Sequence, residues 1–315
     1  MGVLDGKVAV VTGAGHGVGR GYALAMAAAG AKVVVNDLGG SPTGGGADAT
    51  AAEEVARLIV ERGGQAVANG ADVADFGASR EMVAQAVEVF GALDVLVLNA
   101  GITRNRMIFN MDEADWDDVA RVHLNGHFAP ARHAAVHWRA LSKETGRSVD
   151  ASIICTTSIA GLRGNVGQSS YVTAKAGIAM FAVALAQDLE RYGVRANAIA
   201  PSGLTRLVAL LPGRDEEVRE PDEYEGYVDT DPANMAPLAV WLASDLSRHV
   251  NGQVFFAQHG SVTHYRPWTP GATVTVPGGD RRWEAEELGR ALDAMAFGSR
   301  HSGLDGVGYH TGGAR

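Results

Sequence analysis

The chain has few of the features that mark secreted, membrane-bound or nucleic-acid-binding proteins. It contains a single cysteine, Cys155, among 315 residues, which excludes an intramolecular disulfide and is typical of a reducing compartment. Positive charge is also scarce, because 27 lysines and arginines face 36 acids and leave a net charge of −9. This balance gives no indication of nucleic-acid binding, and no basic amphipathic helix favours a membrane surface.

The N-terminal stretch lacks a long apolar run. Val8–Thr12 has only five residues before glycines begin, which is too short for a signal-peptide core or a membrane span. We therefore expect a soluble, cytoplasmic protein. The apolar content of 46% is sufficient for the core of one large domain or two small ones.

A strand-like run, a glycine-rich turn and a helix-like stretch follow one another near the start of the chain. Lys7–Val11 is rich in β-branched residues, which predicts a buried parallel strand. The sequence TGAGHGVG then supplies Gly13, Gly17 and Gly19, followed by an alanine-rich helical pattern. Glycines permit a tight turn and let backbone N–H groups approach a pyrophosphate at a helix N-terminus. The pattern indicates a dinucleotide site.

An acid at the end of the second predicted strand supports this interpretation. Asp37 follows Val33–Asn36 and lies eighteen residues beyond Gly19, where a carboxylate can accept hydrogen bonds from the adenosine ribose. The same carboxylate would repel the 2′-phosphate of NADP. The turn carries His16 in place of a lysine or arginine, and no arginine sits beside Asp37. These residues favour NAD as the cofactor.

Short apolar strands alternate with helices through the rest of this half. Helices are predicted over Ala51–Arg62 and Phe76–Phe90, and strands over Gln65–Ala68 and Val95–Leu98. This order predicts an α/β fold with a doubly wound parallel sheet and helices on both faces. Ligands of such sheets bind outside the carboxyl ends of the strands. Four residues that stand out fall at such ends, namely Asp72, Asn99, Ser158 and Pro201.

Tyr171 and Lys175 provide the main chemical signal in the second half of the chain. On a helix, their spacing of four residues places them on one face, with side-chain bases about 5–6 Å apart. A nearby ammonium favours the phenolate form of a tyrosine. Ser158 follows the apolar run Ala151–Cys155, and a hydroxyl there can hold a substrate oxygen. The three residues indicate proton removal from an alcohol or proton delivery to a carbonyl.

From residue 5 to about residue 260, the chain resembles the short-chain dehydrogenase/reductase family. The matching pieces are TGAGHGVG, Asp72-Val73, the NAG of Asn99–Gly101, Ser158 and the YVTAK of Tyr171–Lys175. The resemblance implies a single Rossmann-like domain with the cofactor across the strand ends. It also implies a tyrosine base, a serine that holds the substrate oxygen, and a lysine that binds the ribose and favours the phenolate. The implied cofactor-binding residues are Gly13, His16, Gly17, Val18, Gly19, Asp37, Asp72, Val73, Asn99, Ala100, Gly101, Tyr171, Lys175, Pro201, Gly203, Leu204 and Thr205.

A narrower resemblance concerns the substrate. The segments NDLGG, VHLNGHF, GNVGQSSY and RHAAVHWRALSKETG are similar to the (3R)-hydroxyacyl-CoA dehydrogenase module of peroxisomal multifunctional enzymes and to actinobacterial relatives. This implies an NAD-dependent oxidoreductase that interconverts a secondary alcohol and a ketone on an acyl-thioester or steroid-type small molecule. It also implies a homodimer or homotetramer. The alternatives are an NADPH-using 3-oxoacyl-carrier-protein reductase and a non-catalytic dinucleotide-binding protein.

One position departs from the family pattern. Many members carry a catalytic asparagine in the long helix predicted here over residues 113–141, and alignment on Phe128 places His123 there. Either the proton relay differs, or a local bulge displaces Asn125 from that role. His123 and His127, four residues apart, also have a spacing that can bind a metal. Without a third ligand arranged with them, we interpret them as packing residues and predict no metal site.

The last third of the chain combines an acidic segment with an extension. Residues 206–232 hold nine acids against three arginines, which predicts either a mobile substrate lid or a solvated acidic loop. Strands are predicted over Val194–Ile199 and Val254–Ala257. We expect a dehydrogenase domain over residues 1–263 and an extension over 264–315. In the extension, Asp280 would cap a helix over Trp283–Phe297.

Overall fold

A computed structural model describes residues 2–211, 217–266, 268–270, 272–278 and 281–293. The chain divides into two compact units, Met1–Tyr265 and Arg266–Arg315. In the second unit, the described helix is α9 (Ala285–Asp293), within the helix expected over Trp283–Phe297. The rest of that expected helix toward Phe297, and its expected cap Asp280, lie outside the described residues.

The first unit is built on one eight-stranded sheet with the order β3-β2-β1-β4-β5-β6-β7-β8. Its strands are β1 (Val8–Thr12), β2 (Lys32–Asn36), β3 (Gln65–Asn69), β4 (Val95–Leu98), β5 (Ala151–Thr156), β6 (Val194–Ser202), β7 (Val254–Gln258) and β8 (Ser261–Tyr265). Strands β1 to β7 are parallel, which confirms the predicted doubly wound α/β fold. All of their carboxyl ends therefore meet at one edge.

The eighth strand corrects the sequence prediction, in which β7 was the last. The chain reverses over His259 and Gly260 and adds β8 antiparallel to β7, pairing Gln258 with Ser261. His259 has a φ of 52°, as a two-residue hairpin of this twist requires. Histidine is an unusual residue for that conformation, so the turn carries no strong signal in the sequence. The domain boundary expected after residue 263 falls inside this strand.

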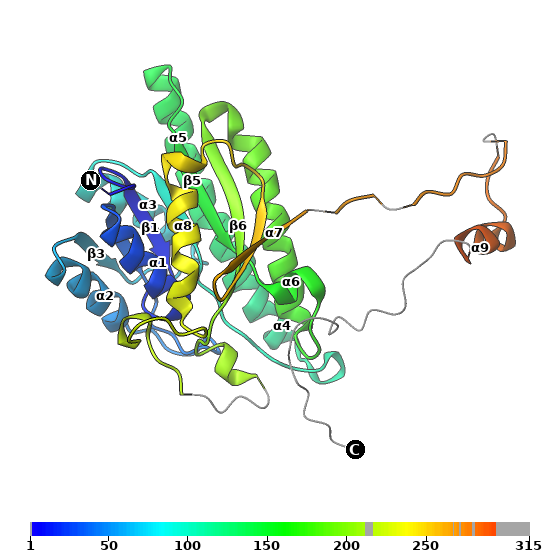
Figure 1. Ribbon diagram of the computed structural model, residues 1–315, viewed down its shortest axis with the longest axis horizontal. Helices are drawn as coiled ribbons and strands as arrows, with labels where there is room; N and C mark the ends of the chain where they lie inside the picture. The colour runs from blue at the N-terminus through cyan, green and yellow to red at the C-terminus, as the bar shows by residue number, and fades with distance from the viewer. Residues whose placement is uncertain (1, 212–216, 267, 271, 279–280, 294–315) are drawn as a thin grey trace. The chain divides into compact units, whose positions relative to one another are not determined.

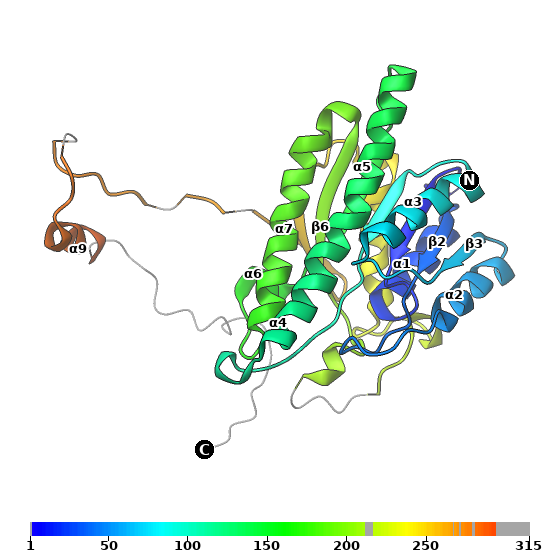
Figure 2. The same ribbon diagram turned by 180° about the vertical axis from the view of Figure 1, so that it is seen from behind.

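Helices cover both faces of the sheet. Figure 1 looks onto the face covered by α1 (Gly17–Ala28), α2 (Thr50–Glu61) and α8 (Ala236–Ala243), and Figure 2 onto the face covered by α3 (Phe76–Phe90), α5 (Gly126–Thr145) and α7 (Ser169–Leu189). Along β1, Ala9 and Val11 pack into the first layer, while Val8 and Val10 pack into the second. Burial on both faces explains why the strands are continuously apolar rather than alternating.

The long helix expected over residues 113–141 is divided. It consists of α4 (Glu113–Ala120), a π-helical turn over Arg121–Asn125, and α5. A π turn adds a residue to the helix and rotates the side chains that follow it. A further short helix, α6 (Ile159–Arg163), which was not predicted, begins directly after Ser158.

The stretch Ser169–Tyr192, formed by α7 and a following turn, is long and apolar enough to cross a membrane by length and composition. Its side chains give the reason for this apolar character. Ile178, Ala182 and Leu185 lie in the core against the sheet, while Lys175 is buried near the strand ends. The helix is therefore a core element of the first unit.

Candidate active site

The glycine-rich turn lies against the end of β4 at the carboxyl edge of the sheet, which is the lower end of the sheet in Figure 1. A Cβ added at Gly13 would be 2.7 Å from the Cα of Ala100, and one added at Gly19 would be 2.1 Å from the carbonyl oxygen of Gly13. Only glycine fits such close backbone approaches. The turn that sequence analysis assigned to a pyrophosphate is thus locked to the Asn99–Gly101 segment.

Thr12 and Asn99 make the hydrogen bonds that hold this junction together. The Thr12 hydroxyl oxygen accepts from the backbone N–H groups of Asn99 (2.9 Å) and Ala100 (3.2 Å). The Asn99 side-chain amide donates to the carbonyls of Thr12 (3.0 Å) and Gly13 (3.1 Å). Thr12 was not among the predicted site residues, although it begins the TGAGHGVG motif.

Asp37 is held beside the same turn. Its carboxylate accepts from the backbone N–H of Gly15 at 2.8 Å and from that of Gly39 at 2.7 Å. A Cβ at Gly15 would be only 2.9 Å from the carboxylate oxygen Oδ2, so a side chain at this position would push Asp37 away. Gly15 is therefore a site residue, although it is not among those predicted from the sequence. Its signal was its place between Gly13 and Gly17 in the motif.

Asp72 and Val73 lie past the end of β3. Asp72 accepts from the backbone N–H of Ala74 at 2.9 Å and forms an ion pair with Arg121 at 2.8 Å. Val73 is buried, and a Cβ at Gly126 would be 2.7 Å from it. Asp72 therefore joins this strand edge to the π turn, and Val73 joins it to the start of α5.

The segment that follows β6, Gly203–Thr205, lies at the same carboxyl edge of the sheet and contacts the glycine-rich turn. Pro201 pairs with Ala257 within the sheet, and a Cβ at Gly203 would be 2.8 Å from Pro232. Leu204 is buried and donates its backbone N–H to Thr230 at 2.8 Å. A Cβ at Gly17 would be 3.1 Å from the Thr205 methyl group, which places Thr205 at the glycine-rich turn.

These features fit a nucleotide cofactor. The turn presents backbone N–H groups at the N-terminus of α1, and an N-terminus of this kind favours an anion. His16 and Val18 flank it, with His16 at the N-cap position and Val18 packed on the core. Asp37 supplies a carboxylate beside the turn.

Ser158, Tyr171 and Lys175 are connected through α6 and α7. Ser158 caps α6 by accepting from the backbone N–H of Ala160 at 3.2 Å. A Cβ at Gly161 would be 2.7 Å from the Cβ of Lys175, so the helix that starts at Ser158 crosses α7 with almost no separation. Lys175 Nζ lies 5.7 Å from the centre of the Tyr171 ring, so the two side chains share one face of α7.

Lys175 is fixed at the end of β5. Its ammonium nitrogen donates to the carbonyl of Thr156 at 2.7 Å, and its own backbone carbonyl accepts from the Thr157 hydroxyl at 2.6 Å. The residues therefore form one rigid unit, in which both ends of Lys175 bond to the strand that leads to Ser158.

A family model for short chain dehydrogenases matches residues 7–209. The chain belongs to the short-chain dehydrogenase family. The predicted family resemblance is confirmed, and members of this family are oxidoreductases that bind a nicotinamide dinucleotide.

Relatives of this short-chain dehydrogenase include hydroxyacyl-CoA dehydrogenase ChsB1 of Mycobacterium tuberculosis, 43% identical over 267 residues that cover 84% of this chain and 81% of that protein. Peroxisomal multifunctional enzyme type 2 of Mus musculus is 40% identical over 80% of this chain, which spans 31% of the mouse enzyme. A crystal structure of a short chain dehydrogenase from Mycobacterium avium is 46% identical and matches with a TM-score of 0.79 over 93% of this chain and 95% of that one.

The π turn decides which residue of the dehydrogenase faces Tyr171. His123 is fully buried, and its ring packs edge-to-face on Tyr171 with centres 5.4 Å apart. Its Nε2 lies 2.8 Å from the carbonyl oxygen of Ile102. Asn125 is exposed instead, in a groove on the outer side of α5. His123 therefore occupies the position against the tyrosine, while the part of either residue in a proton relay stays a prediction.

Burial determines the charge state of the basic residues around this point. Burial lowers the pKa of Lys175 to about 7, with Cys155 opposing the shift. Burial and then the nearby Lys175 lower the pKa of His127 to about 3 and that of His123 well below its usual value. Both histidines are therefore neutral near pH 7. Within the described ranges, no three histidine, cysteine or acidic side chains gather as a metal-binding group.

Gly101→Ala should destabilise the dehydrogenase through His123, because the added methyl would lie 2.4 Å from the Cε1 atom of the imidazole. We expect a loss of roughly 1–3 kcal/mol in the free energy of unfolding. Combining it with His123→Ala should recover part of this loss, with a coupling energy of about 0.5–3 kcal/mol by urea denaturation.

Gly177→Ala is the matched control, because its added Cβ would only meet Leu124 at 3.4 Å, an ordinary contact. It should be neutral or stabilising by up to about 1 kcal/mol, since alanine favours a helix interior. Strict additivity of Gly101→Ala and His123→Ala would contradict the assigned contact.

The lowered pKa of Lys175 predicts a pH-dependent stability difference between the wild-type chain and Lys175→Met. Between about pH 7 and pH 10, the unfolded chain binds a proton at Lys175 that the folded chain does not. Wild-type stability should therefore rise with pH relative to the variant, by up to about 1.4 kcal/mol per pH unit. Below about pH 7 the difference should be constant. Denaturant unfolding at a series of pH values measures it, and a flat difference across the alkaline range would exclude a neutral buried lysine.

Proposed function

We propose that this dehydrogenase is an NAD-dependent cytoplasmic enzyme that interconverts a secondary alcohol and its ketone, with a 3-hydroxyacyl thioester as the substrate. The observation that carries the proposal is that the Ser158–Tyr171–Lys175 unit and the glycine-rich turn with Asp37 lie at the same carboxyl edge of the sheet, after β5 and after β1 and β2, with only β4 between them. A proton-transfer group and a dinucleotide cradle at the same edge suit alcohol oxidation.

In this proposal each member of the unit has one role. The Ser158 hydroxyl holds the substrate oxygen, and Tyr171 as phenolate accepts the proton of the substrate hydroxyl. Lys175, on the same face of α7, stabilises the phenolate by its positive charge and binds the cofactor ribose. Bound NAD supplies the hydride acceptor. His123 keeps the tyrosine ring in place by edge-to-face packing.

Asp37 supports NAD as the cofactor. Both of its carboxylate oxygens bond to backbone N–H groups of Gly15 and Gly39, which fixes the negative charge at the end of β2. A carboxylate in this place suits the free hydroxyls of an NAD ribose and opposes the extra phosphate of NADP. The NADPH-using 3-oxoacyl-carrier-protein reductase is therefore the less favoured alternative.

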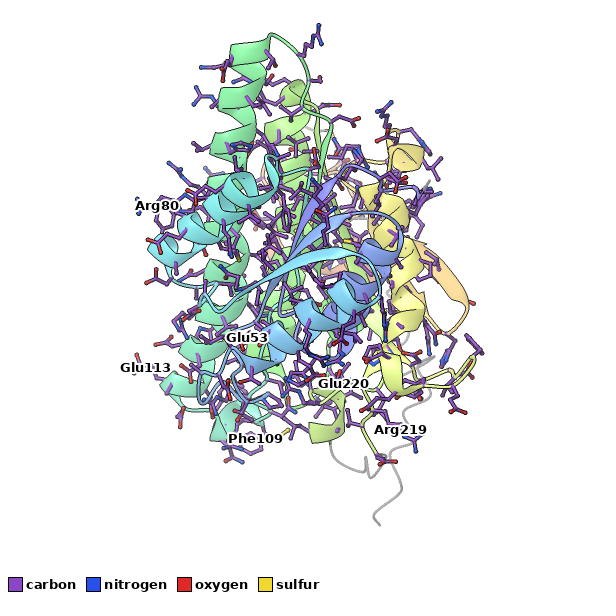
Figure 3. The ribbon with its side chains drawn as sticks, turned by 90° about the vertical axis from the view of Figure 1, so that its left-hand side faces the viewer. Glu53, Arg80, Phe109, Glu113, Arg219 and Glu220 are labelled. Atoms are coloured by element: carbon purple, nitrogen blue, oxygen red, sulfur yellow. The ribbon has the colours of Figure 1, made fainter. Side chains whose placement is uncertain are left out.

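The acyl-thioester substrate is supported by the two relatives named above and by an apolar surface near the catalytic unit. The loop before α4 pairs with the loop between α6 and α7 through the Arg106 N–H and the Gly167 carbonyl at 2.8 Å. These two loops expose Ile108, Phe109 and Val166 by 62%, 76% and 69%, and Figure 3 labels Phe109 at this edge. An acyl chain or a steroid-like group would cover such side chains.

A substrate and cofactor screen tests the proposal. The wild-type chain should reduce NAD with 3-hydroxyacyl-CoA thioesters and prefer NAD over NADP. Tyr171→Phe should bind NAD normally and lose most of its turnover, on the order of a hundredfold or more, because the phenol oxygen is the proton acceptor. Preference for NADPH would favour the carrier-protein reductase, and NAD binding without turnover on thioesters, hydroxysteroids or small alcohols would favour a non-catalytic role.

We also propose that the enzyme self-associates through the outer face of α5 and α7. A groove of about 290 Å³ on this face is lined by Leu124, Asn125, His127, Phe128, Gly177, Ile178 and Phe181. Phe128 in the groove is exposed, as are two further large apolar side chains of the same two helices, Val136 of α5 and Met180 of α7. A second copy of the chain would remove this apolar surface from water.

Phe128→Asp should shift the protein toward the monomer in sedimentation velocity, because it places a charge in the proposed interface. Val60→Asp is the control, since Val60 is similarly exposed (54% against 49%) on α2, a helix of the opposite sheet face. A monomeric wild-type chain, or equal effects of the two substitutions, would exclude this interface.

A further inference from the structure

The N-terminus of α1 binds a carboxylate from a distant part of its own chain. His16, at the N-cap position, makes no capping hydrogen bond to the helix. Instead, Glu220 accepts from the backbone N–H of Gly17 at 2.7 Å through one oxygen and lies 2.6 Å from His16 Nδ1 through the other. A side chain 203 residues away thus occupies a donor of the turn that we assign to the cofactor.

A second acid from the same segment anchors it to α1. Asp222 accepts from Arg20 Nε at 2.6 Å and from Arg20 Nη2 at 2.9 Å, a two-point ion pair. Arg20 is almost completely buried and also bonds to Glu54 on α2 at 3.0 Å. The short helical turn that follows Glu220, Pro221–Glu223, contains Asp222 and is closed by the Glu223 side chain, which accepts from the Glu220 backbone N–H. Glu220 is therefore presented to the turn by a structured piece of chain.

The Glu220 carboxylate provides the negative charge that the N-terminus of α1 favours, so this anion site is already occupied. Burial raises the pKa of Glu220, but the hydrogen bonds from His16 and Gly17 outweigh it and hold the pKa below its usual value. The side chain is a carboxylate near pH 7, 19% exposed, on a helix N-terminus that favours negative charge. A pyrophosphate uses the same kind of N–H donor. Two anions cannot share one donor without strong repulsion.

We propose that Glu220 is an internal competitor of the cofactor: its carboxylate occupies the pyrophosphate position of the glycine-rich turn in the free enzyme and must leave when NAD binds. The inference rests on the proposed binding of NAD at this turn. The ion pair of Asp222 with Arg20 keeps the segment nearby, so that Glu220 returns when the cofactor dissociates. Figure 3 labels Glu220 just below α1 and α2, at the strand-end edge of the first unit.

Glu220→Ala should bind NAD about tenfold more tightly than the wild-type chain, because the competent state no longer has to be reached by displacing a bound carboxylate. Isothermal titration calorimetry of the full chain with NAD measures this directly and needs no turnover. Glu220→Gln keeps the shape of the side chain and removes its charge, so it should give an intermediate gain. It also keeps the test open if the alanine variant does not fold.

Two controls separate direct competition from general electrostatics. Glu225→Ala removes the same charge from the same exposed segment without touching the turn, and it should leave the NAD affinity within about twofold of wild type. Adenosine, which has no pyrophosphate, should bind wild type and Glu220→Ala equally. An equal gain for Glu225→Ala, or an equal gain for adenosine, would overturn the proposal.

The direction of the change in NAD affinity decides whether Glu220 competes with the cofactor. Equal or weaker NAD binding by both Glu220 variants, with NAD bound well by the wild type, would show that Glu220 does not compete, and would leave the proposed function intact. Failure of the folded wild type and of both variants to bind NAD would instead remove the proposed function, and this inference with it.

Discussion

The junction between the ends of β1 and β4 is the contact on which the rest of the site depends. Thr12 and Asn99 exchange hydrogen bonds across it, and the backbone of the glycine-rich turn is pressed against Ala100. Parallel strands end at one edge, so this junction lies where the chain leaves β1 for α1 and where it leaves β4 through Gly101. Gly101 in turn leaves the space that the His123 ring fills beside Tyr171. Cofactor cradle and proton-transfer unit are therefore positioned by one set of backbone contacts.

The second constraint is the burial of bases. Lys175, His123 and His127 are all buried at the same place in the core, and burial disfavours a charge on each of them. The Thr156 carbonyl is the hydrogen-bond acceptor of the Lys175 ammonium. The Lys175 nitrogen also lies 5.7 Å from the centre of the Tyr171 ring, so the proposed chemistry places a proton acceptor directly beside a buried base.

The acidic segment has a more specific role than its composition indicates. The composition of residues 206–232 predicts a mobile lid or a solvated loop, whereas the described part of this segment is tied to α1 through Glu220 and Asp222. Arg104 and Arg106 are likewise occupied by ion pairs with Asp118 and Asp115. The positive charge of each of these two arginines is therefore already balanced by a neighbouring acid within the chain.

The sequence by itself determined the elements whose signals are local. β-Branched runs that end in glycine marked the parallel strands, because strands buried on both faces must be continuously apolar. The bounds of α3, Phe76–Phe90, were predicted correctly, since Asp75 caps its start and Gly91 ends it with a φ of 86°. The spacing of Tyr171 and Lys175 and the order of the glycine motifs identified the family, while the roles of these residues stay predictions.

Only the tertiary structure decided the features that join distant segments. The π turn at Arg121–Asn125, which selects His123 over Asn125, depends on how α4 and α5 fit around the strand edge. The β8 hairpin reverses at His259 and Gly260, with His259 at a φ of 52°, and two such residues give only a weak turn signal along the chain. The contact of Glu220 with Gly17 links residues 203 positions apart. Each of these features depends on which surfaces come into contact when the helices pack on the sheet. No periodicity or motif along the chain predicts those contacts.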